Sequence, residues 1–322
     1  MRYAKIGFAI AAACLLIPLT SGTGQVMGQE FARAGAQCGA RSKAQAGAFE
    51  VTSALGRRLN ALPDDDAVVA ARKKLAADPK NASLVLALSQ AQAGRRQYRE
   101  AVATCTEGLG FAPDNANLYI ERGHREVGLR EFARAQSDLE HAVSIDPKKL
   151  DAYYHLGLAH YFQGQFDAAA ESFQKALALA KNDDSVIDCT NWLYVSLRRA
   201  GKDKEAAETL KRITPEMKNT EPHLFFYLQL LRFYQGAKTE QEVLPAKLAD
   251  PNDTEGELLF DTVTYGVGNW HLYNHEPARA TELFKQVVTG NAWNAWGFVG
   301  AETELARMDK SGGGKEPRRA GL

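Results

Sequence analysis

Three prolines spaced 34 residues apart constrain the fold of this chain more than any other feature. These residues, Pro79, Pro113 and Pro147, each follow a segment with helical periodicity. Proline cannot continue the interior of a helix, and it biases the preceding residue away from the helical conformation. Each proline therefore ends a pair of short helices. One pair cannot bury its own apolar face, so the spacing predicts a stacked array of such pairs.

The clearest pair covers Asp151 to Leu179, where large and small residues recur at fixed positions. Tyr153 and Phe173 are large enough to fill the space between two helices, whereas Gly157 and Ala169 let two backbones approach closely. The spacing is W-x2-L-G-x2-Y followed by A-x3-F, with Tyr in the Trp position and His in the Tyr position. It resembles the tetratricopeptide repeat. The resemblance implies an all-α fold, a right-handed α-solenoid of helical hairpins with a C-terminal capping helix.

The same register divides the chain into segments. Four repeats are expected over residues 82–220, and residues 221–308 should form a divergent helical hairpin, a last repeat over 261–294 and the capping helix. Residues 29–81 should form N-terminal helices that fit a degenerate repeat. Within them, the segment 30–60 is rich in Ala, Arg and Gln and predicts a weakly amphipathic helix.

The N-terminus has the layout of a signal peptide. Arg2 and Lys5 precede an apolar run from Ile6 to Leu19, which is too short to span a bilayer comfortably. We therefore expect residues 1–28 to be removed on export, with the bacterial periplasm as the expected location and an uncleaved anchor as the lesser alternative. At the other end, residues 309–322 contain three consecutive glycines and are expected to form a disordered tail.

Cys14 offers an alternative to simple cleavage. It follows three alanines, as in bacterial lipoproteins in which an acylated cysteine becomes the first mature residue. The apolar run continues past Cys14, and Ala11 stands where the lipoprotein pattern has Leu, so lipidation is the weaker alternative. It would make the protein an outer-membrane lipoprotein, and this lipid anchor is the only membrane contact that the sequence predicts.

Composition and motifs argue against nucleic-acid binding, metal binding and catalysis. The 39 basic residues equal the 39 acidic ones and are spread through the helices, so nucleic acid is not an expected partner. Cys38, Cys105 and Cys189 have no short spacing, which excludes a disulfide framework or a metal knuckle. His271 and His275 are four residues apart, but Glu276 and Pro277 start a new helix there, so we do not expect the two histidines to share a face and bind a metal. We find no catalytic or phosphate-binding motif, and we expect a non-enzyme without a cofactor.

Two short segments of the second half are similar to the NlpI family of periplasmic tetratricopeptide lipoproteins. They run from Phe233 to Leu244 and from Ala280 to Asn291, within a likeness that covers residues 82–308. The resemblance implies an adaptor that forms a homodimer and brings peptidoglycan hydrolases together with a protease. Trp293 and Trp296 are expected to pack on the last repeat, with a dimer contact as the alternative.

In tetratricopeptide-repeat proteins the first helix of each pair lines a concave groove. Carried over by register, this face would present the predicted groove residues Gln90, Ile120, His124, Tyr154, Leu158, Tyr161, Asn191, Arg198, Tyr265, Asn269 and Tyr273. Aromatic and polar side chains together suit an extended peptide or a helix laid in a groove. The predicted function is an exported adaptor for proteins or peptides, in envelope or peptidoglycan maintenance. The alternative is a structural homo-oligomer without a groove ligand, whose aromatic side chains only pack the solenoid.

Overall fold

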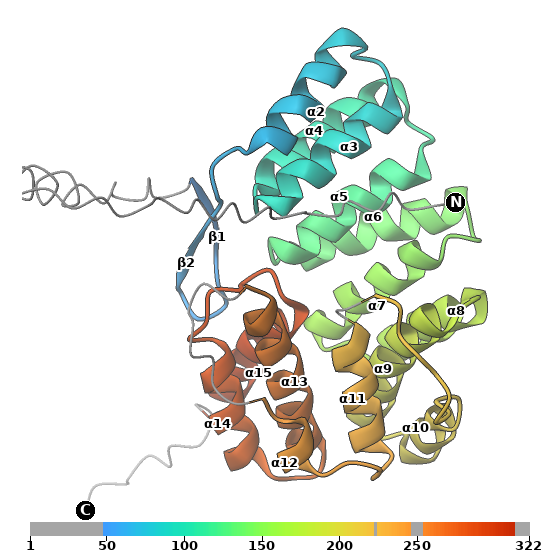
Figure 1. Cartoon of the computed structure of the whole chain (residues 1–322), viewed down its shortest axis with the longest axis vertical. Helices are drawn as coiled ribbons and strands as arrows, with labels where there is room; N and C mark the ends of the chain where they lie inside the picture. The colour runs from blue at the N-terminus through green and yellow to red at the C-terminus, as the bar shows by residue number, and fades with distance from the viewer. Residues whose placement is uncertain (1–47, 222–223, 246–253, 313–322) are drawn as a thin grey trace, which may run out of the picture. The chain divides into compact units, whose positions relative to one another are not determined.

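The computed structural model describes residues 48–221, 224–245 and 254–312, all within one compact unit that begins at Ala46. In these residues the fold consists of helices and a single two-stranded sheet (Figure 1). The signal peptide, Cys14, Cys38 and the tail from residue 313 lie outside the described residues. None of the described helices is long and apolar enough to cross a membrane.

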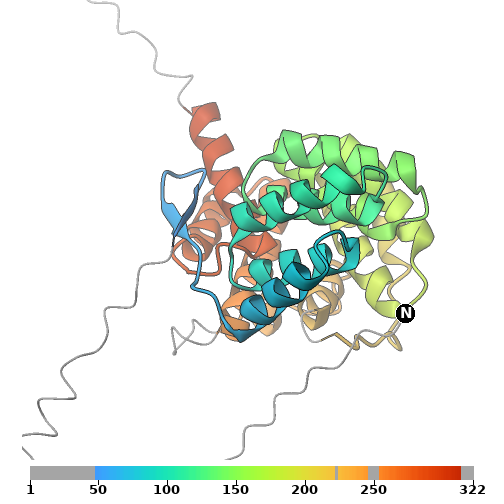
Figure 2. The same cartoon turned by 90° about the horizontal axis from the view of Figure 1, so that it is seen from above.

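Consecutive helices pack as antiparallel pairs over the predicted repeats (Figures 1 and 2). The pairs are α3 (Ala82–Gly94) with α4 (Tyr98–Phe111), α5 (Ala116–Gly128) with α6 (Phe132–Ile145), α7 (Leu150–Gln163) with α8 (Phe166–Leu179), and α9 (Asp183–Arg199) with α10 (Asp203–Leu210). The prediction of stacked helical hairpins is confirmed.

The contact between the two helices of a pair depends on the small residue of the repeat pattern. A Cβ atom placed on Gly157 would lie 2.7 Å from ring carbons of Phe173, and one on Gly123 would lie 2.8 Å from Leu139. These distances are shorter than van der Waals contact, so a larger residue would force the helices apart. The Gly157–Phe173 pair is buried, as the repeat pattern predicts.

The helix predicted over 30–60 is wrong for its described part. Residues 48–60 instead form a hairpin of antiparallel strands, β1 (Phe49–Thr52) and β2 (Arg58–Asn60), followed by α2 (Asp66–Ala77). Gly56 adopts a left-handed conformation with φ of 81° in the turn, which a helix does not allow. The hairpin is also held by residues distant in sequence, because Arg57 donates hydrogen bonds to the carbonyls of Val288 and Gly290.

The C-terminal part continues the array and then folds back onto it. It comprises α11 (Leu224–Tyr234), α12 (Glu240–Val243), α13 (Thr254–Tyr273), α14 (Pro277–Val287) and α15 (Trp296–Gly312). The last helix, α15, packs on α13 and α14, as a helix that covers the last repeat should. It also contacts α7, near the middle of the array, and residues 297–305 are buried on every face.

Two buried acidic residues of α15 fix this position. Glu302 accepts a hydrogen bond from Nε of Arg130, in the turn after α5, at 2.5 Å, and neither side chain is more than 8% exposed. Glu304 pairs with Arg199 of α9 at 2.6 Å. A buried pair is not strongly stabilising in itself, but removal of one partner leaves the other charge buried and uncompensated.

Replacement of Glu302 by Gln should therefore destabilise the fold by about 3 kcal/mol, because the Arg130 guanidinium keeps its charge and loses its carboxylate. Chemical denaturation of the purified chain measures this change. Glu171→Gln, which breaks an exposed pair with Lys175, is the matched control and should leave the free energy of unfolding unchanged. Equal stability of the two variants would show that α15 is not held by this pair.

Candidate functional site

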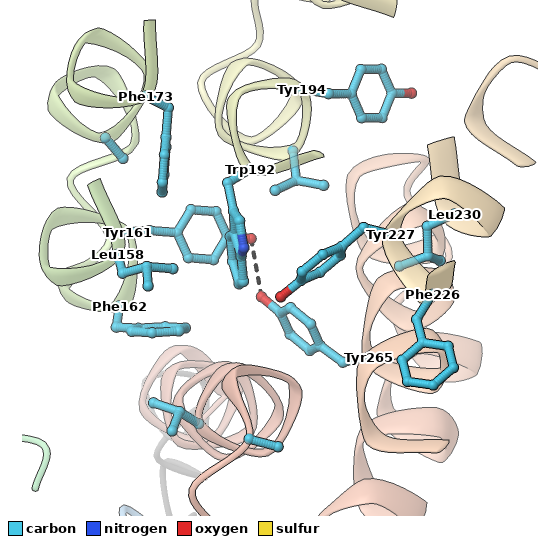
Figure 3. Close-up of a cluster of buried hydrophobic side chains, with 14 of the residues drawn as sticks. Leu158, Tyr161, Phe162, Phe173, Trp192, Tyr194, Phe226, Tyr227, Leu230 and Tyr265 are labelled. Atoms are coloured by element: carbon cyan, nitrogen blue, oxygen red, sulfur yellow. Dashed lines mark hydrogen bonds between the residues drawn. The ribbon is translucent and has the colours of Figure 1, made fainter. Parts of the chain in front are cut away.

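Five of the predicted groove residues lie together in the core instead of on an open surface. The Tyr265 hydroxyl donates a hydrogen bond to the Tyr161 hydroxyl at 3.1 Å (Figure 3). The Asn269 side-chain amide donates one to the same oxygen at 2.7 Å. Leu158 and Asn191 are buried beside them. None of the five is more than 4% exposed. In this arrangement they offer no surface to a peptide, and a binding role for them stays a prediction.

Three further predicted groove residues are occupied by contacts within the chain. Tyr154 is buried and donates a 2.8 Å hydrogen bond to Oδ1 of Asp188, and burial raises the pKa of that aspartate to about 7. Arg198 lies 4.3 Å from the ring centroid of Tyr273 and donates a hydrogen bond to Asn274. Tyr154 therefore pairs with Asp188, and Arg198 pairs with Tyr273, within the fold.

A cavity of about 340 Å3 opens between the first repeats and the C-terminal elements. One wall comes from the first repeats and carries Gln90, Gly94, Tyr98, His124 and Arg125. We call this the concave cavity. Gln90 is exposed and His124 half-buried, so two of the predicted groove residues reach it, whereas the half-buried Ile120 is not part of its lining.

The opposite wall of the concave cavity comes from the C-terminal elements and was not predicted. It carries Phe226 and Tyr227 of α11, Leu258 of α13, and Trp296 at the start of α15. The position of α11 across from α3 and α5 depends on contacts between residues distant in sequence, which local periodicity does not report. Trp293 is buried, packs on Tyr98 and donates a hydrogen bond to the Asn60 carbonyl, so it serves the fold.

Among the described residues that line these walls, Arg125 is the single charged side chain, and its neighbour Glu121 neutralises it. The Nε atom of Arg125 lies 2.9 Å from Oε1 of Glu121, and the guanidinium stands over the ring of Tyr98 at 5.7 Å. Ser89 donates a further hydrogen bond to Glu121. A cavity with aromatic walls and a paired charge favours apolar or aromatic side chains over charged ones.

The wall residue His124 stacks on a second histidine, His155. The rings of His124 and His155 are 3.9 Å apart, and both approach Trp296. Burial lowers the pKa of His155 to about 3, with a smaller contribution from the nearby Arg125. The pKa of His124 is also lowered well below its usual value by burial, Arg125 and His155. At neutral pH both rings are uncharged and act as aromatic packing surface.

This pair predicts a loss of stability at acid pH. The pKa of His155 is lower in the folded state than in the unfolded state, so its contribution is present above about pH 6.5 and is lost as the pH falls toward 3. Between pH 7 and pH 5, His155→Phe should lose about 2 kcal/mol less stability than the natural chain. Urea unfolding at the two pH values measures it. A substitution of the exposed His141 by Gln is the control, and a similar pH slope in all three proteins would contradict the prediction.

A larger cavity of about 660 Å3 lies elsewhere, between α8, α9 and α10. Leu177 and Leu193 are among its lining residues, and α10, with 8 residues, is shorter than the 14-residue α8. It belongs mainly to the second helices of the pairs, so we take the concave cavity as the candidate site. Among the described residues, no group of three or more His, Cys, Asp or Glu side chains is arranged to hold a metal ion.

Comparisons with known proteins identify the repeat. Residues 150–183 match the family model described as tetratricopeptide repeat. No curated protein matches the chain. Among solved structures, MamA is 20% identical over 53% of this chain and 90% of its own, with a TM-score of 0.41. The NlpI resemblance stays a prediction.

Two further solved structures are similar. YrrB, described as a TPR protein with an unusual peptide-binding site, is 18% identical over 64% of this chain and 97% of its own, with a TM-score of 0.33. A tetratricopeptide repeat protein from Parabacteroides merdae is 19% identical over 74% of this chain and 90% of its own, with a TM-score of 0.45.

Proposed function

We propose that this chain, a tetratricopeptide-repeat protein, is a non-catalytic interaction scaffold that binds a peptide segment of a partner protein in the concave cavity. The observation that supports this most is the position of the cavity. Two of the predicted groove residues, Gln90 and His124, line it, and it has aromatic residues on both walls. Aromatic side chains in desolvated pockets contribute strongly to protein–protein binding.

The dimensions of the concave cavity limit what it can hold. Ligand pockets typically range from about 300 to 1,000 Å3, and 340 Å3 is near the lower end. The cavity therefore suits one or two apolar or aromatic side chains of a peptide. The exposed amide of Gln90 stands at its rim, where it can bond a peptide main chain.

A partner laid along the whole predicted groove is less compatible with the packing. It would have to separate α15 from α7 and break the hydrogen bonds at Tyr161. Tyr161→Ala is a poor test of binding. Loss of a fully buried aromatic side chain lowers the free energy of unfolding by about 3–5 kcal/mol, and unfolding would remove binding as well.

Gly94 provides a sharper test. It lines the concave cavity, and a Cβ added there meets nothing within 4 Å, so Gly94→Arg should fill the cavity without disturbing the helices. We expect at least about a tenfold loss of captured partner, equivalent to 1.4 kcal/mol of binding. Cross-linking in cells followed by quantitative mass spectrometry measures it.

Gly110→Arg is the matched control for this experiment. Gly110 is also an exposed helical glycine with nothing within 4 Å of an added Cβ, and it lies outside the cavity. Its partners should match those of the natural chain. If Gly94→Arg retains the same partners at the same abundance, the concave cavity is not the binding site.

We further propose that binding takes place outside the cytoplasm, in the bacterial envelope, with homodimerisation and a lipid anchor at Cys14 as subordinate proposals. The support is the charged, then apolar, then small-residue pattern of residues 1–28. The intact mass of the chain recovered from cells should show loss of this segment. A full-length mass without lipid would contradict export by this route.

A further inference from the structure

Two buried carboxyl groups of α13 face the turn between α14 and α15. Glu257 and Asp261 are one helical turn apart and are 8% and 1% exposed. Glu257 accepts a hydrogen bond from the backbone N–H of Asn291. Both carboxyl oxygens of Asp261 are buried and have no hydrogen-bond partner among the described residues, which is rare for an acidic side chain.

Three oxygen atoms approach the open side of Gly290. The position that a Cβ on Gly290 would take is 2.8 Å from Oε1 of Glu257, 3.2 Å from the Val287 carbonyl and 3.6 Å from Oδ1 of Asp261. The Val287 carbonyl accepts one hydrogen bond, from Gly290 N–H, and keeps a second lone pair. A glycine at position 290 therefore leaves free the space on which the three oxygens converge.

Among the described residues, the nearby arginines form no hydrogen bond with these carboxyl groups, and Arg96 interacts with Glu257 only through its charge. Arg57 donates to the carbonyls of Val288 and Gly290, and Arg96 donates to the carbonyl of Asn291. Two buried carboxyl groups this close cannot both carry an unpaired charge, so they need a bound cation or a shared proton. Burial and the neighbouring Glu257 raise the pKa of Asp261 to about 8, which is consistent with a lack of positive charge beside it.

We propose that Glu257, Asp261 and the Val287 carbonyl form a binding site for a divalent cation of the calcium class, which ties α13 to the turn that leads into α15. The donor atoms are all oxygens, carboxylate and carbonyl, which hard cations prefer. Calcium accepts irregular sets of such ligands completed by water, whereas magnesium requires a nearly ideal octahedron. The site is independent of the concave cavity and of its proposed ligand.

Titration of the full chain, after removal of metals with a chelator, tests the proposal. Calorimetry with calcium chloride should give one site per chain, with proton release visible as a dependence on buffer ionisation, because Asp261 must lose its proton to bind. At a hundredfold excess over the dissociation constant, Tm should rise by about 5 °C. Magnesium chloride should bind more weakly.

Asp261→Asn should abolish both the calorimetric signal and the Tm shift. Glu126→Gln is the matched control, because Glu126 is another buried carboxyl with an unpartnered oxygen and a pKa raised by burial to about 8, far from Gly290 in the chain. It should keep the calcium response. Calcium binding that survives in Asp261→Asn would overturn the proposal. So would a natural chain whose Tm does not respond to calcium and instead falls as the pH rises from 6 to 9, because that fall is the sign of a shared proton.

Discussion

Contacts between hairpin turns and the C-terminal segment organise this molecule. Residues 96, 130 and 164 occupy the same turn position in three successive pairs, and each has a left-handed backbone. Arginine in this conformation costs about 1 kcal/mol or more relative to glycine. Arg96 and Arg130 use the position to reach the carbonyl of Asn291 and the carboxylate of Glu302.

At the third turn the direction of the contact is reversed. Gly164 has no side chain, and Arg307 of α15 comes to the turn instead, donating a hydrogen bond to the carbonyl of Phe162. The Nε atom of Arg307 lies 3.4 Å from where a Cβ on Gly164 would be, and φ at Gly164 is 81°. That distance is ordinary van der Waals contact, so the left-handed backbone conformation is what favours glycine here.

The contacts between the repeats and the C-terminal segment determine how much of the groove could be predicted from the sequence. The 34-residue spacing and the Gly157–Phe173 pair predict stacked hairpins because they report contacts within one repeat. Register places Tyr161 on the first-helix face, but it does not say what covers that face. Tyr161 accepts a hydrogen bond from Tyr265, 104 residues later in the chain. Local periodicity cannot predict such a contact. A sequence signal of long-range contacts in this region is the pair of acids, Glu302 and Glu304, in the otherwise uncharged stretch 296–306 of the last helix.

The segment 288–296 is where these contacts meet. It receives Arg57 of the N-terminal hairpin, faces the carboxyl groups of Glu257 and Asp261, and ends at Trp296 in the cavity wall. Sites joined by one segment are coupled only if that segment has two arrangements that each site favours differently. The buried Glu302–Arg130 pair opposes a second position for α15. A partner in the concave cavity is therefore expected to bind a largely preformed wall, with little ordering cost at this side.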